Sequence, residues 1–317
     1  MFCVHANPYC TALVPHLADR PVDNAGMRLL VSHLTRYRYA PPVQASEHWA
    51  HLEPTSGPTQ QVLQHEIALD PWPVRTAERG FDAWGNACLH WQLPAPHEHM
   101  QVLARSEVQT GTLQAPTSIP VWDGRTNAAD GLQPWLGASP HIPLEPVFAD
   151  LARAHFAPGK PLDLCALDLC ARLHREWRYE PLSTNIDTSV HHVLATHRGV
   201  CQDFAHLLIA ALRSLGQPAG YVSGYLLTAP PAGQPRLVGA DATHAWVRLW
   251  VPGVQNHPGG GWLHLDPTNH RHGWGSPGED YVQLAVGRDF SDVSPLRGVL
   301  QGETRQTLEV EVTVESI

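Results

Sequence analysis

The sequence predicts an α+β protein, in which a run of strands is followed by a region of mixed helices and strands. Apolar and polar residues alternate with period two in several stretches between Arg28 and Thr110. After residue 143, apolar residues recur at steps of three and four, as on one face of an α-helix. Two further alternating stretches follow the clearest helix. This order predicts a small all-β domain in front of an α+β core.

Length and charge limit the kinds of protein that this chain can be. Its 317 residues are enough for two domains, each with its own core. The formal net charge is −9, and Lys160 is the only lysine, so the clustered basic residues of a nucleic-acid-binding surface are absent. We therefore expect no nucleic-acid partner. Because no apolar run is long enough to span a bilayer, we also expect no membrane partner.

The first 26 residues share no pattern with the rest of the chain. Three prolines, Pro8, Pro15 and Pro21, disfavour regular structure there. The segment has no basic stretch followed by an unbroken apolar stretch, so we predict no signal peptide. We expect residues 1–26 to be disordered, or to precede a translation start at Met27.

The all-β domain is predicted to cover residues 27–112, and a linker rich in Pro, Gly, Ser and Thr covers 113–143. The spacing of the strands favours a small sandwich or an open barrel. Pro41 and Pro42 are expected to end the first strand. The predicted strands are 30–39, 63–69, 87–93 and 100–109.

The core is predicted to cover residues 144–295, and a C-terminal segment, 296–317, contains a final strand with no predictable partner. Helices are expected around 147–151, over 162–177, and from a cap at Thr188 or Ser189 to about 197. A fourth helix begins near Cys201 and is ended by Gly216 and Pro218. Its apolar face consists of Phe204, Leu207, Leu208, Ala211, Leu212 and Leu215. A strand over 219–228 and a loop over 230–240 at the edge of the cleft follow.

Cys201 lies at the start of the fourth predicted helix, where unpaired backbone N–H groups and the helix dipole stabilise an anion. Such a position generally favours the nucleophilic thiolate. Position alone leaves a small structural residue as an equal alternative. In a nucleophilic role, the backbone N–H of Cys201 would donate to an oxyanion, and candidates for the second donor are Trp177, Tyr179 and Asn185.

His244 and Asp266 lie on two alternating stretches, 241–251 and 262–266, separated by a glycine-rich turn. If the strands pair about residue 255, the two side chains are directly opposed, with Cβ atoms roughly 4.5–5.5 Å apart. The carboxylate would then hold one imidazole nitrogen and leave the other for Cys201. A slip of one residue would separate them. His206 points away along its helix, so His244 is the preferred base.

Three blocks of the sequence resemble the catalytic blocks of the bacterial transglutaminase-like superfamily, in the order Cys, His, Asp. They are Gly199-Val-Cys-Gln-Asp-Phe-Ala-His206, Thr243-His-Ala-Trp246 and Asp266-Pro-Thr-Asn269. In addition, Leu30–Val43 and Asp82–Asn86 resemble the β-rich N-terminal domain of one bacterial branch, and Gly287–Val293 resembles its C-terminal stretch.

The resemblance implies a papain-like core in which Cys201 attacks, His244 shuttles a proton and Asp266 orients His244. Gln202, Asp203 and Trp246 are expected to support this site. For Asp203, a helix-capping role and a substrate contact are both open.

We therefore expect a thiol enzyme that forms a thioester with a peptide or carboxamide substrate. Our leading hypothesis is a cysteine peptidase or amide hydrolase. The alternatives are a transglutaminase, which transfers the acyl group to an amine, and a catalytically silent binding module. No cofactor is expected, and no metal site, because the 21 histidines show no four-ligand spacing.

The six cysteines form no compact disulfide framework, which predicts reduced thiols and a cytoplasmic location. Cys165 and Cys170 are expected in a helix core, and Cys88 in a buried strand. The remaining two, besides Cys201, are Cys3 and Cys10.

Overall fold

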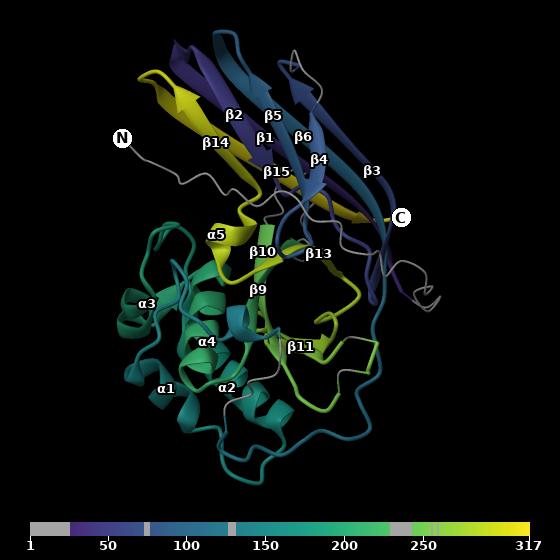
Figure 1. Cartoon of the computed structure of the whole chain (residues 1–317), viewed down its shortest axis with the longest axis vertical. Helices are drawn as coiled ribbons and strands as arrows, with labels where there is room; N and C mark the ends of the chain where they lie inside the picture. The colour runs from purple at the N-terminus through teal and green to yellow at the C-terminus, as the bar shows by residue number, and fades with distance from the viewer. Residues whose placement is uncertain (1–25, 73–76, 126–130, 229–242, 255, 259) are drawn as a thin grey trace, which may run out of the picture.

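The computed structural model describes residues 26–72, 77–125, 131–228, 243–254, 256–258 and 260–317. Two stacked sheets lie at one end of the molecule, and a sheet covered by helices lies at the other (Figure 1). This confirms the predicted α+β class. The expectations for residues 1–25 and for the loop 230–240 fall outside the described residues.

The β domain is a sandwich of two four-stranded antiparallel sheets. The first sheet has the order β15 (Arg305–Ser316), β1 (Arg28–Val43), β6 (His97–Thr110), β3 (Gln60–Asp70). The second has the order β14 (Leu296–Gln301), β2 (Ala45–Ala50), β5 (Ala87–Leu93), β4 (Glu78–Phe81). Side chains of both sheets form one core, which includes Tyr39, Leu52, Trp91, Met100 and Val102.

One expectation for this domain was wrong, and two of its strands were missed. Pro41 and Pro42 do not end the first strand, because β1 continues to Val43 after a register shift that begins beyond Arg38. Strands β2 and β4 were not predicted. In β2 the inward positions include polar residues: His48 Nε2 lies 2.8 Å from Ser46 Oγ, and both side chains are buried. Polar residues on the core side hide the period-two pattern.

The C-terminal segment belongs to the β domain and is not a separate unit. Strand β15 pairs with β1 along its length, from Leu29 opposite Ser316 to Ala40 opposite Arg305, and β14 pairs with β2. The segment 113–143, predicted as a linker, packs on the core instead. Its buried side chains include Trp122, Leu132, Trp135 and Ile142, and it contains the 3-10 helix η1 (Gln133–Trp135).

The core combines a five-stranded sheet with helices packed on it (Figure 1). The sheet has the order β12 (Arg271–Trp274), β11 (Trp262–Asp266), β10 (Thr243–Trp250), β9 (Ala219–Leu226), β13 (Tyr281–Gly287). The helices are α1 (Pro146–Arg153), α2 (Leu162–Glu176), α3 (Val190–Thr196), α4 (Cys201–Ser214) and α5 (Phe290–Val293). The first four agree with the predicted helices; α5, β12 and β13 were not predicted.

Helix α4 is the centre of this core. Every residue from 203 to 213 is buried, because the helix is enclosed by α1, α2, α3 and the sheet. Cys165 and Cys170 are buried on α2, and Cys88 is buried on β5, as expected. The length of α4 is 14 residues. None of the helices in the described ranges is long and apolar enough to cross a membrane.

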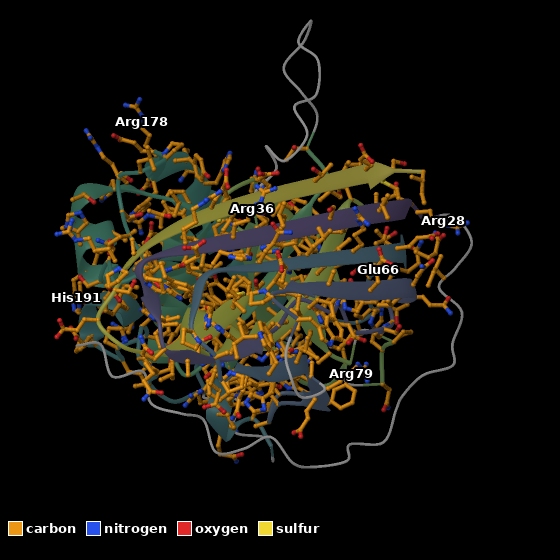
Figure 2. The ribbon with its side chains drawn as sticks, turned by 90° about the horizontal axis from the view of Figure 1, so that it is seen from above. Arg28, Arg36, Glu66, Arg79, Arg178 and His191 are labelled. Carbon is orange, nitrogen blue, oxygen red and sulfur yellow. The ribbon has the colours of Figure 1, made fainter. Side chains whose placement is uncertain are left out.

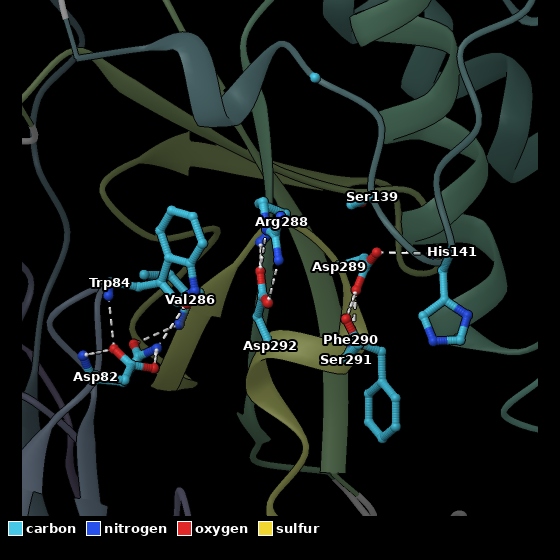
Figure 3. Close-up of polar contacts among 12 residues, drawn as sticks. Asp82, Trp84, Ser139, His141, Val286, Arg288, Asp289, Phe290, Ser291 and Asp292 are labelled. Carbon is cyan, nitrogen blue, oxygen red and sulfur yellow. Dashed lines mark hydrogen bonds and ion pairs between the residues drawn. The ribbon is translucent and has the colours of Figure 1, made fainter. Parts of the chain in front are cut away.

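The two domains are joined by buried polar contacts as well as apolar ones. The Asn86 side chain makes two hydrogen bonds to the backbone of Val286 on β13, at 2.7 and 2.8 Å (Figure 3). On the core side, Asp289 accepts hydrogen bonds from the backbone N–H groups of His141 and Ser291 (Figure 3). The Asn86 bonds hold the β domain against the sheet of the core, and the Asp289 bonds hold the segment 113–143 and α5 together on the core side.

The outward face of the first sheet of the sandwich carries mixed charges. Arg36 pairs with Glu309 at 3.2 Å, and Arg105 pairs with Glu66 at 3.3 Å (Figure 2). Exposed pairs of this kind contribute little to stability.

Candidate active site

Cys201 is the first residue of α4, as its sequence position predicted. Val200 before it is extended, and its backbone N–H donates to Asp203 Oδ2 at 2.8 Å. A first helical residue has no intrahelical acceptor for its own N–H, so the N–H of Cys201 is available to an oxyanion. Gly199 is required here, because a Cβ at this position would lie 2.8 Å from the Cβ of Asp203.

Asp203 acts as the cap of this helix. Its Oδ2 accepts from Val200 N and from the hydroxyl of Thr184 at 2.6 Å, and the side chain is almost completely buried. Burial raises the pKa of this carboxyl, although the two hydrogen bonds oppose the shift. Of the two roles left open for Asp203, the geometry favours capping over substrate contact.

His244 Nε2 lies 2.7 Å from Asp266 Oδ2, and both side chains are buried. They are not directly opposed, so the expected register was wrong. The ladder pairs Val247 with Leu265 and Arg248 with His264, so the strands pair about residue 256 and not about residue 255. Moving the centre by one residue moves the partner of every residue by two. An even shift keeps both side chains on the same face, and diagonal neighbours across a ladder remain within reach of long side chains.

Asp266 is held by further donors that the sequence did not suggest. Tyr281 Oη and Asn269 Nδ2 donate to its Oδ2 at 2.7 and 2.8 Å. The backbone N–H of Thr268 donates to Oδ1 at 2.8 Å. Burial would raise the pKa of Asp266, but these bonds and His244 hold it below its usual value. Tyr281 was missed because β13 was not predicted, whereas Asn269 lies within a block already noted.

The pKa of His244 is raised to about 10. Burial alone would lower it, but hydrogen bonds to Asp266 and to Cys201, together with the negative charges of both, raise it. Since Asp266 takes Nε2, the other ring nitrogen, Nδ1, is left for the thiol. The structure therefore arranges Asp266, His244 and Cys201 in one row, in which the hydrogen bond to Asp266 and the neighbouring thiol both favour a protonated imidazole.

Trp246 packs beside His244, and Gln202 anchors the start of α4 to a neighbouring loop. Trp246 is fully buried, stacks near the ring of His244 and donates its Nε1–H to His264 Nδ1 at 2.9 Å. It therefore supports His244 from within the sheet. Gln202 Nε2 donates to the backbone oxygen of Ile186 at 3.4 Å, which ties the helix start to the loop before α3.

Of the three candidates for a second oxyanion donor, Tyr179 is the one that the structure brings to Cys201. It lies on the short strand β7 (Arg178–Tyr179), paired with Gly199 of β8 (Arg198–Gly199). Burial and then the charge of Cys201 raise the pKa of Tyr179. The indole N–H of Trp177 is already bonded to the oxygen of Val193 at 3.0 Å.

Asn185 and His206 are the remaining candidates, the first for the second oxyanion donor and the second for the base. Asn185 Oδ1 accepts from the backbone N–H of Asp187 at 3.0 Å within its own loop. His206 is buried, stacks on His141, and accepts from the N–H of Phe290 at 3.2 Å. Its place inside the core agrees with the preference for His244. Among the described residues, no group of three or more His, Cys, Asp or Glu side chains has the arrangement of a metal site.

Comparisons with known proteins find relatives that share the family and the fold. Residues 29–109 match the model of the bacterial transglutaminase-like N-terminal region, and residues 156–267 match that of the transglutaminase-like superfamily. The chain is 35% identical over 308 residues to an uncharacterised protein of Mycobacterium tuberculosis, covering 92% of each chain. It is 33% identical over 293 residues to one of Mycobacterium leprae, covering 90% of this chain and 98% of that one.

Two other similarities carry functional names. A candidate cysteine protease from Cytophaga hutchinsonii superimposes with a TM-score of 0.71 at 20% identity, over 93% of this chain and 92% of that one, and shares the fold. A protein-glutamine gamma-glutamyltransferase of Pseudomonas aeruginosa is 34% identical over 122 residues, which is 38% of this chain and 17% of that enzyme.

Proposed function

This chain belongs to the transglutaminase-like superfamily, and on that premise we propose that it is a thiol enzyme acting on amide bonds. Cys201 is the nucleophile, His244 transfers the proton and Asp266 orients His244. The observation that supports this proposal most strongly is the row of side chains from Asp266 through His244 to Cys201, in which Asp266 holds His244 at 2.7 Å and both neighbours raise the pKa of His244. A catalytically silent binding module has no need of that row, so we place it last.

The proposed reaction has two steps. Cys201 Sγ attacks the carbonyl carbon of the amide, and the oxyanion is stabilised by the backbone N–H at the start of α4. His244 gives its proton to the leaving nitrogen as the C–N bond breaks, which leaves a thioester. An acceptor then attacks the thioester carbon, His244 takes the proton of the acceptor, and the C–S bond breaks.

We propose water as the acceptor, so that the enzyme is a cysteine peptidase or amide hydrolase acting on a peptide or protein. Acyl transfer to an amine is the second candidate, favoured by the partial identity to the protein-glutamine gamma-glutamyltransferase. The two differ only in whether an amine or water reaches the thioester first. We place the protein in the cytoplasm because the cysteine pattern is that of reduced thiols.

One incubation separates the two candidates. The protein and its Cys201→Ala variant are each mixed with an unstructured, glutamine-rich protein and a fluorescent primary amine, and both amine incorporation and new chain termini are followed. New termini that depend on Cys201, without labelling, support the hydrolase. Labelling that depends on Cys201, without cleavage, identifies a transferase. Turnover that survives in Cys201→Ala excludes the proposed nucleophile.

A further inference from the structure

Three exposed apolar side chains lie on the segment that leads into α3. Their exposed fractions are 50% for Tyr179, 99% for Leu182 and 59% for Ile186. Single exposed apolar residues are ordinary on a protein surface. These three fall within eight consecutive residues, from the last residue of β7 to the loop before α3. Arg178 of β7 and His191 of α3 are labelled at the helical end of the molecule in Figure 2. We call Tyr179, Leu182 and Ile186 the apolar rim.

The apolar rim is fixed to the start of α4 at three points. The N–H of Glu180 donates to the oxygen of Gly199 at 2.9 Å. The hydroxyl of Thr184 donates to Asp203 at 2.6 Å, and Gln202 donates to the oxygen of Ile186 at 3.4 Å. Gly199, on β8, precedes Cys201 in the sequence, and Gln202 and Asp203, on α4, follow it. Tyr179 itself pairs with Gly199. The rim therefore lies beside the thiol and forms an edge of the candidate active site.

The backbone of the rim favours a residue other than leucine at position 182. The N–H of Ser183 donates to the oxygen of Glu180 at 3.3 Å, and Leu182 has a φ of 63°. Pro181 and Leu182 are the two central residues of this turn. When the second central residue has a positive φ, glycine or asparagine is its usual occupant. A bulky residue with positive φ is rare. Here its side chain is also almost wholly in water, so neither the backbone nor the core of the protein gains from it.

We propose that the apolar rim is the recognition surface for the substrate, and that the substrate is a polypeptide with uncharged, apolar side chains next to the reacting amide. Binding would bury the exposed surface of the three side chains. The hydrogen bonds at both ends of the loop hold the rim in position before substrate arrives, which lowers the entropy cost of binding. The inference rests on the proposed function, because it places this recognition next to Cys201.

Two peptide reagents of equal shape and charge test this inference. Acetyl-Val-Val-Gly and acetyl-Thr-Thr-Gly chloromethyl ketones differ only in replacing methyl groups with hydroxyls. The rate of alkylation of Cys201 by each is measured by mass spectrometry with peptide mapping. We expect the valine reagent to react about fivefold faster, less than the roughly 10- to 200-fold that one methylene gives in a closed hydrophobic pocket, because the rim is an open surface. A ratio near one in the unaltered protein would overturn the inference.

The test variant is Leu182→Asn, because asparagine suits the positive φ and the fold is retained. We expect the Val/Thr ratio to fall to less than half of its original value. Leu308→Asn is the matched control: Leu308 is 56% exposed on β15 of the sandwich, and the ratio should not change. An unchanged ratio in Leu182→Asn, with the same thermal unfolding as the control, contradicts the inference.

A third reagent separates this inference from the proposed function. Iodoacetamide is too small to need the rim and reports only on the thiol. If Cys201 reacts with iodoacetamide at pH 6 no faster than an ordinary thiol, the proposed function fails, and the inference fails with it. If Cys201 reacts rapidly with iodoacetamide while the Val/Thr ratio is near one, the proposed function stands and the apolar rim alone is excluded.

Discussion

His244 and Asp266 are joined by a 2.7 Å hydrogen bond although they are not opposite each other on strands β10 and β11. The contact spans the diagonal of the ladder, and Asp266 can make it because Tyr281 and Asn269 fix its carboxylate. The orientation of the proposed base therefore depends on a carboxylate that is itself held from a third strand, β13, and from the turn after β11. The first three predictions below test this arrangement.

Replacing Asp266 by asparagine should lower the turnover number by about 10²- to 10⁴-fold, since an amide cannot stabilise the protonated imidazole and permits the wrong tautomer. The fold should be kept, because asparagine has the same shape. The measurement is turnover of the substrate identified by the incubation described above. Asp168→Asn, on the exposed face of α2, is the matched control and should retain full activity. Full turnover in Asp266→Asn would remove Asp266 from the proposed role.

Replacing His244 by alanine should slow the alkylation of Cys201 by iodoacetamide at pH 6 by about 10²-fold, because the thiol loses its proton acceptor. The measurement is the rate at which unmodified Cys201 disappears, monitored by peptide mapping of samples taken over time. His206→Ala loses a buried histidine outside the site and controls for a general loss of structure, which is monitored by thermal unfolding. A His244→Ala protein that alkylates as fast as the unaltered one argues against His244 as the base.

The stability of the protein should depend on pH through His244. Its pKa is raised from 6.5 to about 10 on folding, so the protonated imidazole stabilises the folded state fully below pH 6.5. That contribution is lost progressively as the pH rises to about 10. We expect the free energy of unfolding to fall more steeply between pH 7 and 10 in the unaltered protein than in His244→Gln. The free energy of unfolding at each pH is measured by urea unfolding. If it falls equally steeply with pH in the two proteins, the protonated imidazole of His244 does not stabilise the folded state.

Asn86 should be important for the contact between the two domains. Its side chain satisfies both the N–H and the C=O of Val286 and also donates to Asp82 (Figure 3). Removing it in Asn86→Ala leaves buried backbone groups without partners, and should lower the free energy of unfolding by about 2–4 kcal/mol. Gln92→Ala, at an exposed position of the strand β5 that follows Asn86, should change it by less than about 0.5 kcal/mol. Urea unfolding monitored by tryptophan fluorescence measures both.

Residue periodicity was sufficient to predict the elements that carry the candidate site. The apolar face of α4 placed Cys201 at a helix start, and the alternation along β10 and β11 placed His244 and Asp266 on strands. Both patterns depend only on neighbours along the chain, although α4 is buried on all sides from residue 203 to residue 213. The same reasoning failed for β2, where buried Ser46 and His48 replace apolar residues on the inner face.

By itself, the sequence determined the order of the elements that carry the candidate site, the residue types of that site and the family to which they belong. Tertiary structure alone decided the register of β10 on β11, the donors that hold Asp266, the Thr184–Asp203 contact and the return of the C-terminal strands to the sandwich. The physical reason is the range of the interactions. Periodicity records the burial of one face of a local element, whereas register, capping from a distant loop and strand partners depend on how remote segments pack.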